Sequence, residues 1–476
     1  MEKNKDDVAE KVMISIISWI DQADKVISKE LKTRFRMKAE EIQKEIVRIK
    51  DYIVSILTDR YLQIEQASKD FNLVKDVRMS LLLSRFVNFS SMVFNIPAYQ
   101  SFGDTLGYYN GKWEFNYGQP KRGAEYTNEL ISEFIALGGV NNISILNWKA
   151  SDDTVLYMAT FKVLSDTFKP DVRYDKMNIN VFGEKFREEY LKAKPLIKDR
   201  GYGIQTFDSL DIQENIKWNE LPYNSRAIGA GAAMRSGCIG FFFPTKRNRK
   251  YLIQLAVESS RITHNSAIAI LGSIVAALFT AYAIEKKPIN RWPHDLLDLL
   301  KSNEIDEYME TSRPKEYHLY KRDKVIYIGH WQKYVEIRFA GLHKIELNHM
   351  KNPVLRYQYL SDNFSKGCDI PGSCGDDCLI MAYDALLESD GVLEKAIVYS
   401  ILHPGDSDTV GSISLSWFGA LYGSPHNNNI LRENLNNLEF YKEIYVLCAD
   451  TIPQMVQVLY YDVYLSIADD YMTNFL

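Results

Sequence analysis

The sequence feature that most constrains this fold is an apolar run of 18 residues, Ala267–Ile284, whose only polar members are Ser273, Thr280 and Tyr282. A run of this length lies at the lower limit for a membrane-spanning helix. It is rich in small residues, and the sequence contains no second comparable run, which favours a helix buried in a large helical core. We therefore predict a helical core that contains this segment.

Helical periodicity recurs along the rest of the chain. Apolar residues repeat at spacings of three and four, and no alternation of strands with helices indicates a parallel sheet. Strand-like alternation is confined to short pieces such as residues 324–328. We expect an all-α fold, with further helices over residues 125–135, 153–168, 185–193, 251–261, 293–301, 379–387, 393–402 and 437–448.

The first 85 residues differ from the rest of the chain. Residues 6–79 are dense in Lys, Glu and Ile, contain no Pro or Gly, and carry apolar stripes typical of amphipathic helices packed as a hairpin or coiled coil. We predict a helical extension over residues 1–85 and a main domain over residues 86–476. The extension is interpreted as a cap or oligomerisation element, or as a module that docks a partner.

Composition and cysteine usage limit the compartment and the partners. A net charge of -5 gives no overall attraction to nucleic acid or to an anionic membrane. No signal peptide is visible, and five cysteines in 476 residues predict reduced thiols in a cytosol-like compartment. The group Cys368, Cys374 and Cys378 lacks the paired spacing of a zinc site, so we expect it to be packing. We expect a cytoplasmic protein, or one delivered into a host cytosol without a classical signal peptide.

Two acidic stretches stand at the starts of predicted helices. Gly405-Asp406-Ser407-Asp408-Thr409 precedes one apolar segment, and Ser151-Asp152-Asp153-Thr154 precedes another. Each stretch alone is typical of a helix N-terminus, where Asp, Ser and Thr cap free N–H groups. Facing each other, they would offer about the oxygen ligands that two Mg²⁺ ions need once waters and substrate are added. Both interpretations stay open on spacing alone.

Three further features are weak when each is taken alone. Glu114 lies in a segment rich in Gly and aromatic residues, which predicts a loop. The small residues of Gly229-Ala230-Gly231, ahead of Met234 and Arg235, suit either close phosphate approach or tight helix packing. His264 is more typical of a hydrogen-bonded structural residue than of a ligand.

Taken in order, these motifs resemble those of the ADP-ribosylglycohydrolase family. The resemblance covers roughly residues 90–450 and is closest to the ADP-ribosylarginine hydrolase branch, through residues 107–115, 148–154, 221–244, 276–283 and 382–385. The motifs that carry it are Gly103-Asp104-Thr105-Leu106-Gly107 with Glu114, Ser151-Asp152-Asp153-Thr154, Gly231-Ala232-Ala233-Met234-Arg235, Thr263-His264 before an Ala-rich helix, and Gly405-Asp406-Ser407-Asp408-Thr409.

The resemblance implies an orthogonal all-α bundle with two Mg²⁺ ions in a central site. It implies catalytic roles for Glu114, Asp152 and Asp153, with Glu114 on a loop over the substrate. The implied metal ligands are Ser151, Asp152, Asp153, Asp406, Asp408 and Thr409. The implied substrate-binding residues are Gly229 and Gly231 against the diphosphate, Met234, Arg235 and His264, and Ser373 and Gly375 near the distal part of the ligand.

The implied activity is Mg²⁺-dependent hydrolysis of the N-glycosidic bond between ADP-ribose and a protein arginine. A mono-ADP-ribosylated protein would be the substrate and ADP-ribose the product. The alternatives are hydrolysis of another ADP-ribose linkage, to serine or a small molecule, and a non-catalytic ADP-ribose-binding protein. Departures from the family pattern lie at Pro97, Asn265-Ser266-Ala267, Pro404 and Gly375-Asp376-Asp377. They bear on the adenosine end and the protein substrate.

Overall fold

The computed structural model describes residues 28–29, 32, 38, 41–48, 77–116, 123–168, 177–423 and 429–451. The chain divides into two compact units, residues 1–91 with 449–476, and residues 92–448. Most of the helices predicted within residues 6–79 lie outside the described residues, and the domain boundary after residue 85 stays a prediction. All of the candidate site residues belong to the unit of residues 92–448.

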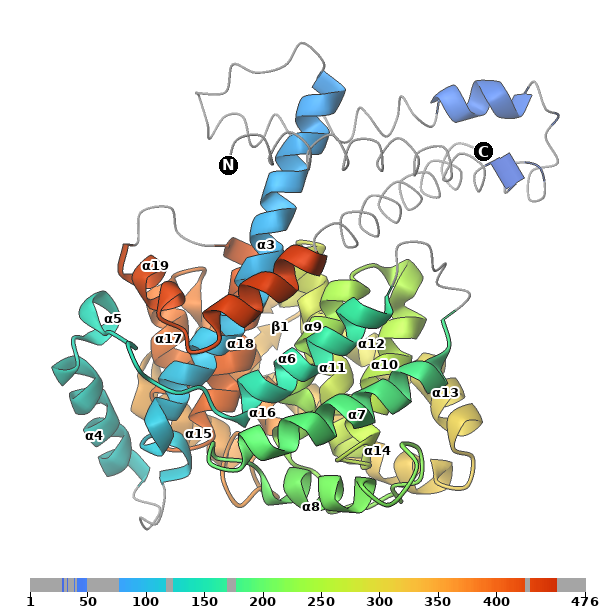
Figure 1. Cartoon of the computed structure of the whole chain (residues 1–476). Coiled ribbons are helices and arrows are strands. Elements are labelled where there is room, and N and C mark those ends of the chain that lie inside the picture. The colour runs from blue at the N-terminus through green and yellow to red at the C-terminus, as the bar shows by residue number, and fades with distance from the viewer. Residues whose placement is uncertain are drawn as a thin grey trace. The chain divides into compact units, whose positions relative to one another are not determined.

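Within the described residues, the regular structure of this unit is helical apart from one hairpin with two residues in each strand, as predicted (Figure 1). Strands β1 (Phe339–Ala340) and β2 (His343–Lys344) pair antiparallel, with Phe339 opposite Lys344. The helices are α3 (Val77–Tyr108), α4 (Gly123–Ala136), α5 (Gly139–Asn142), α6 (Asp152–Thr167), α7 (Ile179–Ile197), α8 (Ile204–Gln213), α9 (Ala233–Phe242), α10 (Arg249–Arg261), α11 (Ala267–Ile284), α12 (Trp292–Lys301), α13 (Glu304–Ser312), α14 (Tyr317–Arg338), α15 (Pro353–Phe364), α16 (Asp377–Ser389), α17 (Leu393–Ile401), α18 (Ser407–Tyr422) and α19 (Asn429–Asn436).

The apolar run forms α11 with the predicted bounds, and every one of its residues is buried. It packs against α9 and α10, which precede it in the chain, and against α14 and α18, which follow it. Among the described residues, α11 alone is long and apolar enough to cross a membrane. Because the core helix of a soluble protein has the same composition, that property is weak evidence for a span.

The strand-like prediction for residues 324–328 is wrong, because this segment lies inside α14. Val325 and Ile326 are 62% and 55% exposed, so these β-branched residues do not face a core. The buried residues of α14 are Tyr320, Tyr327, Trp331, Tyr334 and Arg338, which recur at helical spacing. The helical pattern is therefore set by the aromatic residues from Tyr320 to Tyr334, together with Arg338, and it overrides the local alternation.

Helices α3 and α18 cross in close contact through two glycines. A Cβ atom on Gly107 would lie 2.3 Å from the carbonyl oxygen of Ser407, and one on Gly103 would lie 2.3 Å from that of Gly411. The glycines are four residues apart and so share one face of α3. Their lack of side chains places the α3 backbone directly against the N-terminus of α18.

Candidate active site

The two acidic helix starts predicted from the sequence lie next to each other. Ser151 caps α6 by accepting a 3.0 Å hydrogen bond from the N–H of Asp153. Asp406 caps α18 by accepting a 3.2 Å hydrogen bond from the N–H of Thr409. Asp153 then joins the two helices, because its carboxylate accepts from the Ser412 hydroxyl at 3.0 Å and from the Thr409 hydroxyl at 3.4 Å. Each acidic stretch therefore caps its own helix, and the two helix N-termini also contact each other through Asp153.

The carboxylates at this junction are buried and close enough to repel one another. Burial, and then the charge of Asp408, raise the pKa values of Asp152, Asp153 and Asp406 well above the usual range. Burial also raises the pKa of Asp408 itself. Across the described residues, these four carboxylates form no ion pair with a Lys or Arg side chain. Buried, uncompensated carboxylates with flanking hydroxyls are the donor chemistry that a hard divalent cation requires.

Asp104 is a site residue to which the sequence interpretation gave no role. Its buried carboxylate accepts hydrogen bonds from the N–H of Ser151 at 3.1 Å, from the N–H of Thr154 at 3.0 Å and from the Thr154 hydroxyl. Burial and the nearby Asp408 raise the pKa of Asp104 to about 7. An Asp near the end of an apolar helix, one residue after a packing glycine, is the sequence signal that could have identified it.

Glu114 lies in the short helix η2 (Glu114–Asn116), beside the start of α18. The N–H of Phe115 donates a 3.2 Å hydrogen bond to the carbonyl of Gly405. Tyr109, Asn110 and Phe115 all have left-handed backbone angles, with φ of 42°, 55° and 57°. Burial, followed by the charges of Asp408 and Asp406, raises the pKa of Glu114 well above its usual range. A strained segment therefore brings Glu114 to the junction as a sixth acidic group, after the four carboxylates of the helix starts and Asp104.

The glycine segment pairs with the loop that carries Ser373. The N–H of Ala230 donates to the Ser373 carbonyl at 2.8 Å, and the N–H of Gly375 donates to the Ile228 carbonyl at 2.8 Å. Gly229 and Cys374 form the corresponding antiparallel bridge. The structure thus places both predicted substrate-binding loops side by side.

His264 and Arg235 support the glycine segment from the core. A Cβ atom on Gly231 would lie 2.7 Å from Cε1 of His264, so the imidazole packs directly on the glycine. Burial, and then the charge of Arg235, lower the pKa of His264 to about 3, which keeps the ring neutral. The guanidinium of Arg235 donates to the Gly231 carbonyl at 3.0 Å and to the Ser259 carbonyl at 2.6 Å. Met234, 5% exposed, lies next to it in the same helix.

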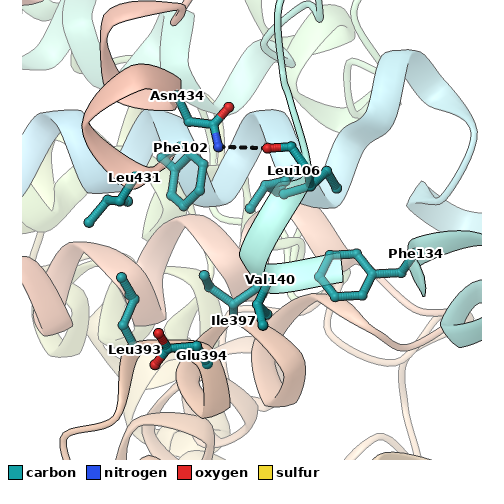
Figure 2. Close-up of a pocket in the computed structure, with 10 residues that line it drawn as sticks. Phe102, Leu106, Phe134, Val140, Leu393, Glu394, Ile397, Leu431 and Asn434 are labelled. Carbon is teal, nitrogen blue, oxygen red and sulfur yellow. Dashed lines mark hydrogen bonds between the residues drawn. The ribbon is translucent and has the colours of Figure 1, made fainter. Parts of the chain in front are cut away.

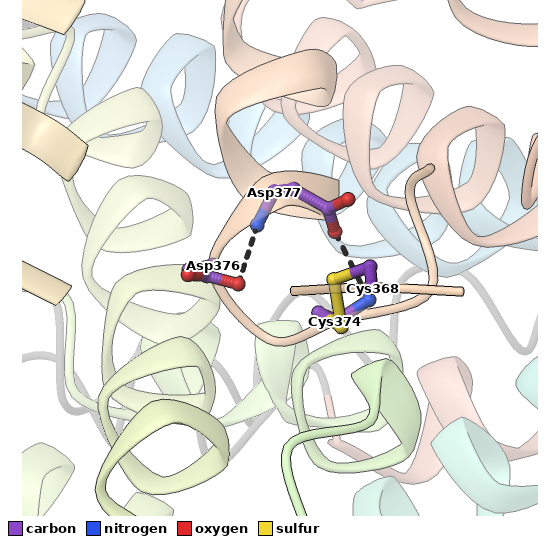
Figure 3. A group of neighbouring side chains, drawn as sticks. All are labelled: Cys368, Cys374, Asp376 and Asp377. Carbon is purple, nitrogen blue, oxygen red and sulfur yellow. Dashed lines mark hydrogen bonds between the residues drawn. A yellow bond between two sulfur atoms is a disulfide. The ribbon is translucent and has the colours of Figure 1, made fainter. Parts of the chain in front are cut away.

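The Ser373 loop contains a disulfide between Cys368 and Cys374 (Figure 3). The prediction that all five cysteines are reduced is therefore wrong for this pair. Cysteine number and spacing do not reveal that the loop folds back and brings the two Cα atoms to 6.0 Å. The other three thiols, of Cys238, Cys378 and Cys448, are free and buried.

Figure 3 also shows Asp376 and Asp377 beside the disulfide. In the part of the chain that the structure describes, these four residues are the compact group of possible metal ligands, with donor atoms within 4.8 Å of one another. Their donors are already engaged, because the two sulfurs bond to each other and Asp377 accepts from the N–H groups of Gly372 and Cys374 at 2.8 and 3.0 Å. The buried carboxylates at the starts of α6 and α18 therefore remain the candidate metal ligands.

Comparison with known proteins gives consistent matches. The family model "ADP-ribosylglycohydrolase" matches residues 100–460. The "Putative ADP-ribosyl glycohydrolase L444" of Acanthamoeba polyphaga mimivirus is 59% identical over 388 residues, 81% of this chain and 75% of the relative. "ADP-ribosylhydrolase ARH1" of Dictyostelium discoideum is 33% identical over 363 residues, 71% of this chain and 88% of the relative. A solved "ADP-ribosylglycohydrolase-related protein complex" is 16% identical, with a TM-score of 0.45 over 77% of this chain and 99% of that one. The family match spans both acidic helix starts and both loops predicted to bind substrate, and the chain belongs to the ADP-ribosylglycohydrolase family.

Proposed function

We propose that this protein hydrolyses the N-glycosidic bond between ADP-ribose and an arginine side chain of a modified protein, in a reaction that depends on two Mg²⁺ ions. The observation that carries the proposal is the meeting of the acidic N-termini of α6 and α18 around Asp153. The preference for arginine rests on the resemblance of residues 107–115 to the arginine-specific branch of the family.

The chain's own residues fit the proposed metal site. Ser151, Asp152 and Asp153 would hold the ions from α6, and Asp406, Asp408 and Thr409 would hold them from α18. When bound, Mg²⁺ would offset the carboxylate charge and hold the ribose through its hydroxyls so that C1″ faces the attacking water. The glycine segment and the Ser373 loop would receive the diphosphate and the distal part of the ligand.

Two carboxylates can accept the proton of the attacking water, Glu114 and Asp153. Glu114 approaches from the η2 segment, whereas Asp153 is shared between the two helix starts. Removing a general base lowers the rate by about 10²- to 10⁴-fold and leaves metal binding in place. Removing a metal ligand lowers both the rate and the affinity for Mg²⁺. Measuring Mg²⁺ binding by calorimetry alongside turnover for Glu114→Gln and Asp153→Asn therefore separates the two roles.

The decisive experiment is a hydrolysis panel of arginine-linked, serine-linked and small-molecule ADP-ribose conjugates, with Mg²⁺ titration and an EDTA control. We expect arginine-linked substrate to be hydrolysed and EDTA to abolish turnover. Asp153→Ala and Asp408→Ala should both be inactive. Wild-type turnover that persists in EDTA and in both variants would refute the site, and ADP-ribose binding without turnover on any conjugate would indicate a binding protein.

A further inference from the structure

The backbone of Ala150, the residue before the α6 cap, is held by two charged side chains. The guanidinium of Arg200 donates to the Ala150 carbonyl at 2.8 Å. The Glu439 carboxylate accepts from the Ala150 N–H at 2.9 Å. Both hydrogen-bonding groups of one backbone position are thus satisfied by side chains 50 and 289 residues away.

Arg200 and Glu439 also bind each other in a two-pronged ion pair. Nη1 of Arg200 lies 2.7 Å from Oε2 of Glu439, and Nη2 lies 2.8 Å from Oε1. Paired parallel hydrogen bonds of this kind fix geometry as well as contribute energy. The guanidinium also lies over the ring of Phe440, 5.2 Å from its centroid. The pair forms a rigid bracket around Ala150.

The same segment contacts the first carboxylate of the site. The carbonyl of Arg200 accepts a 3.0 Å hydrogen bond from the N–H of Asp152. The backbone of Gly203, three residues on, lies close enough to the Asp152 carboxyl group to lower its pKa, against the larger effect of burial. Residues 200–203 therefore contact both the backbone and the side chain of Asp152.

The segment that leads to Ala150 is also hydrogen-bonded to α19. The Asn434 side chain accepts from the N–H of Ile145 at 3.0 Å and donates to the carbonyl of Ile143 at 2.9 Å. Figure 2 shows this amide at the edge of an apolar recess that Phe102 and Leu106 line from α3. The approach to the α6 start is fixed at two points, residues 143–145 and residue 150.

We propose that Arg200 and Glu439 are positioning residues that orient the α6 carboxylates, Asp152 and Asp153, in the candidate metal site. Neither touches the proposed ions or substrate, and the inference rests on the proposed Mg²⁺-dependent function. Residues that orient metal ligands from the second layer typically change metal affinity or activity by about 10- to 100-fold. A bracket that only stabilised the fold would lower the melting temperature and leave the Mg²⁺ affinity of the folded protein unchanged.

The test compares Arg200→Lys and Glu439→Gln in the full chain with a matched control pair. Arg187 on α7 makes the same kinds of contact between α7 and α8, donating to the Gln213 carbonyl at 2.8 Å and pairing with Glu184 at 3.0 Å. The control variants are therefore Arg187→Lys and Glu184→Gln. Glu439→Gln is the mildest change, since it removes the charge of the pair and keeps the length of the side chain, and it decides the question if Arg200→Lys fails to fold.

Two measurements are made on each protein. Hydrogen exchange in the metal-free protein should show the amides of Ala150 and Asp152 exchanging about tenfold faster in the bracket variants than in the controls. Calorimetry should show Mg²⁺ binding weakened about 10- to 100-fold in the bracket variants and within twofold of wild type in the controls.

Wild-type exchange and wild-type Mg²⁺ affinity in both bracket variants would overturn the inference. A melting temperature that falls while Mg²⁺ affinity stays unchanged would overturn it too, because the pair would then be structural only. If the wild-type protein itself neither binds Mg²⁺ nor hydrolyses the conjugates, the proposed function fails. The exchange rates of Ala150 and Asp152 then still show whether the bracket holds this backbone.

Discussion

Replacing Gly107 by Ala should disable the active site without unfolding the protein. The new Cβ would lie 2.3 Å from the Ser407 carbonyl and 2.5 Å from the Asp408 nitrogen, where ordinary contact begins near 3.4 Å. Because backbone atoms cannot swing away as a side chain can, the start of α18 must move by about 1 Å. A displacement of that size in a catalytic array can cost about 10²-fold in rate.

Two matched glycine variants show whether the effect comes from the site. Gly103→Ala makes an equal overlap at Gly411, one turn further along α18, so it should lower stability similarly but reduce turnover less. Gly329→Ala, inside α14, meets nothing within 4 Å and should raise stability by about 1 kcal/mol through helix propensity. Turnover of arginine-linked ADP-ribose, Mg²⁺ affinity and melting temperature are measured for all three.

The prediction is refuted if Gly107→Ala keeps wild-type Mg²⁺ affinity and turnover. Equal losses of turnover in Gly107→Ala and Gly103→Ala would also refute it, since a general disturbance of the crossing would then explain both. The expected result is a loss of turnover that is deepest at Gly107, with the protein still folded at the assay temperature.

Three further outcomes are expected. The pKa of Asp104 is raised to about 7 in the fold from 3.8 in the unfolded chain, so the folded state binds more protons between these two values. The melting temperature of the metal-free protein should therefore fall as pH rises from 5 to 8, and Mg²⁺ should oppose the fall. A melting temperature that rises with pH in EDTA would contradict this. Asp384→Asn should cost about 3 to 5 kcal/mol in urea unfolding, because it breaks the buried ion pair with Arg338 at 2.7 Å. Reducing the Cys368–Cys374 disulfide with dithiothreitol should lower stability by about 2 kcal/mol and weaken ADP-ribose binding but not Mg²⁺ binding, as calorimetry would show.

The sequence predicted the helical class and the acidic helix starts because both are local signals. The continuous apolar run located α11 to the residue, and the Ser and Asp caps marked the beginnings of α6 and α18. That the two starts would meet was one of two open interpretations. The family resemblance, and not spacing, favoured it.

The features that the sequence did not predict depend on partners far apart in the chain. Arg200 carries no local sequence signal, because its partner Glu439 is 239 residues away in the chain. Asp104 acts on α6, and the tyrosines of α14 face a core that local alternation could not reveal. The disulfide requires a loop to fold back, which cysteine counting does not detect.

The complete burial of α11 has a consequence for how the protein is made. Two of the helices that cover it, α9 and α10, are synthesised before it, but α14 and α18 follow it on the ribosome. At about 5 to 20 residues per second, α18 emerges on the order of ten seconds after α11. During that interval the 18-residue apolar helix lacks the cover that α14 and α18 provide in the finished fold. Nascent chains that stop before α18 should therefore depend on chaperones and aggregate without them, and the last-made part of the active site is also what completes the shielding of the core.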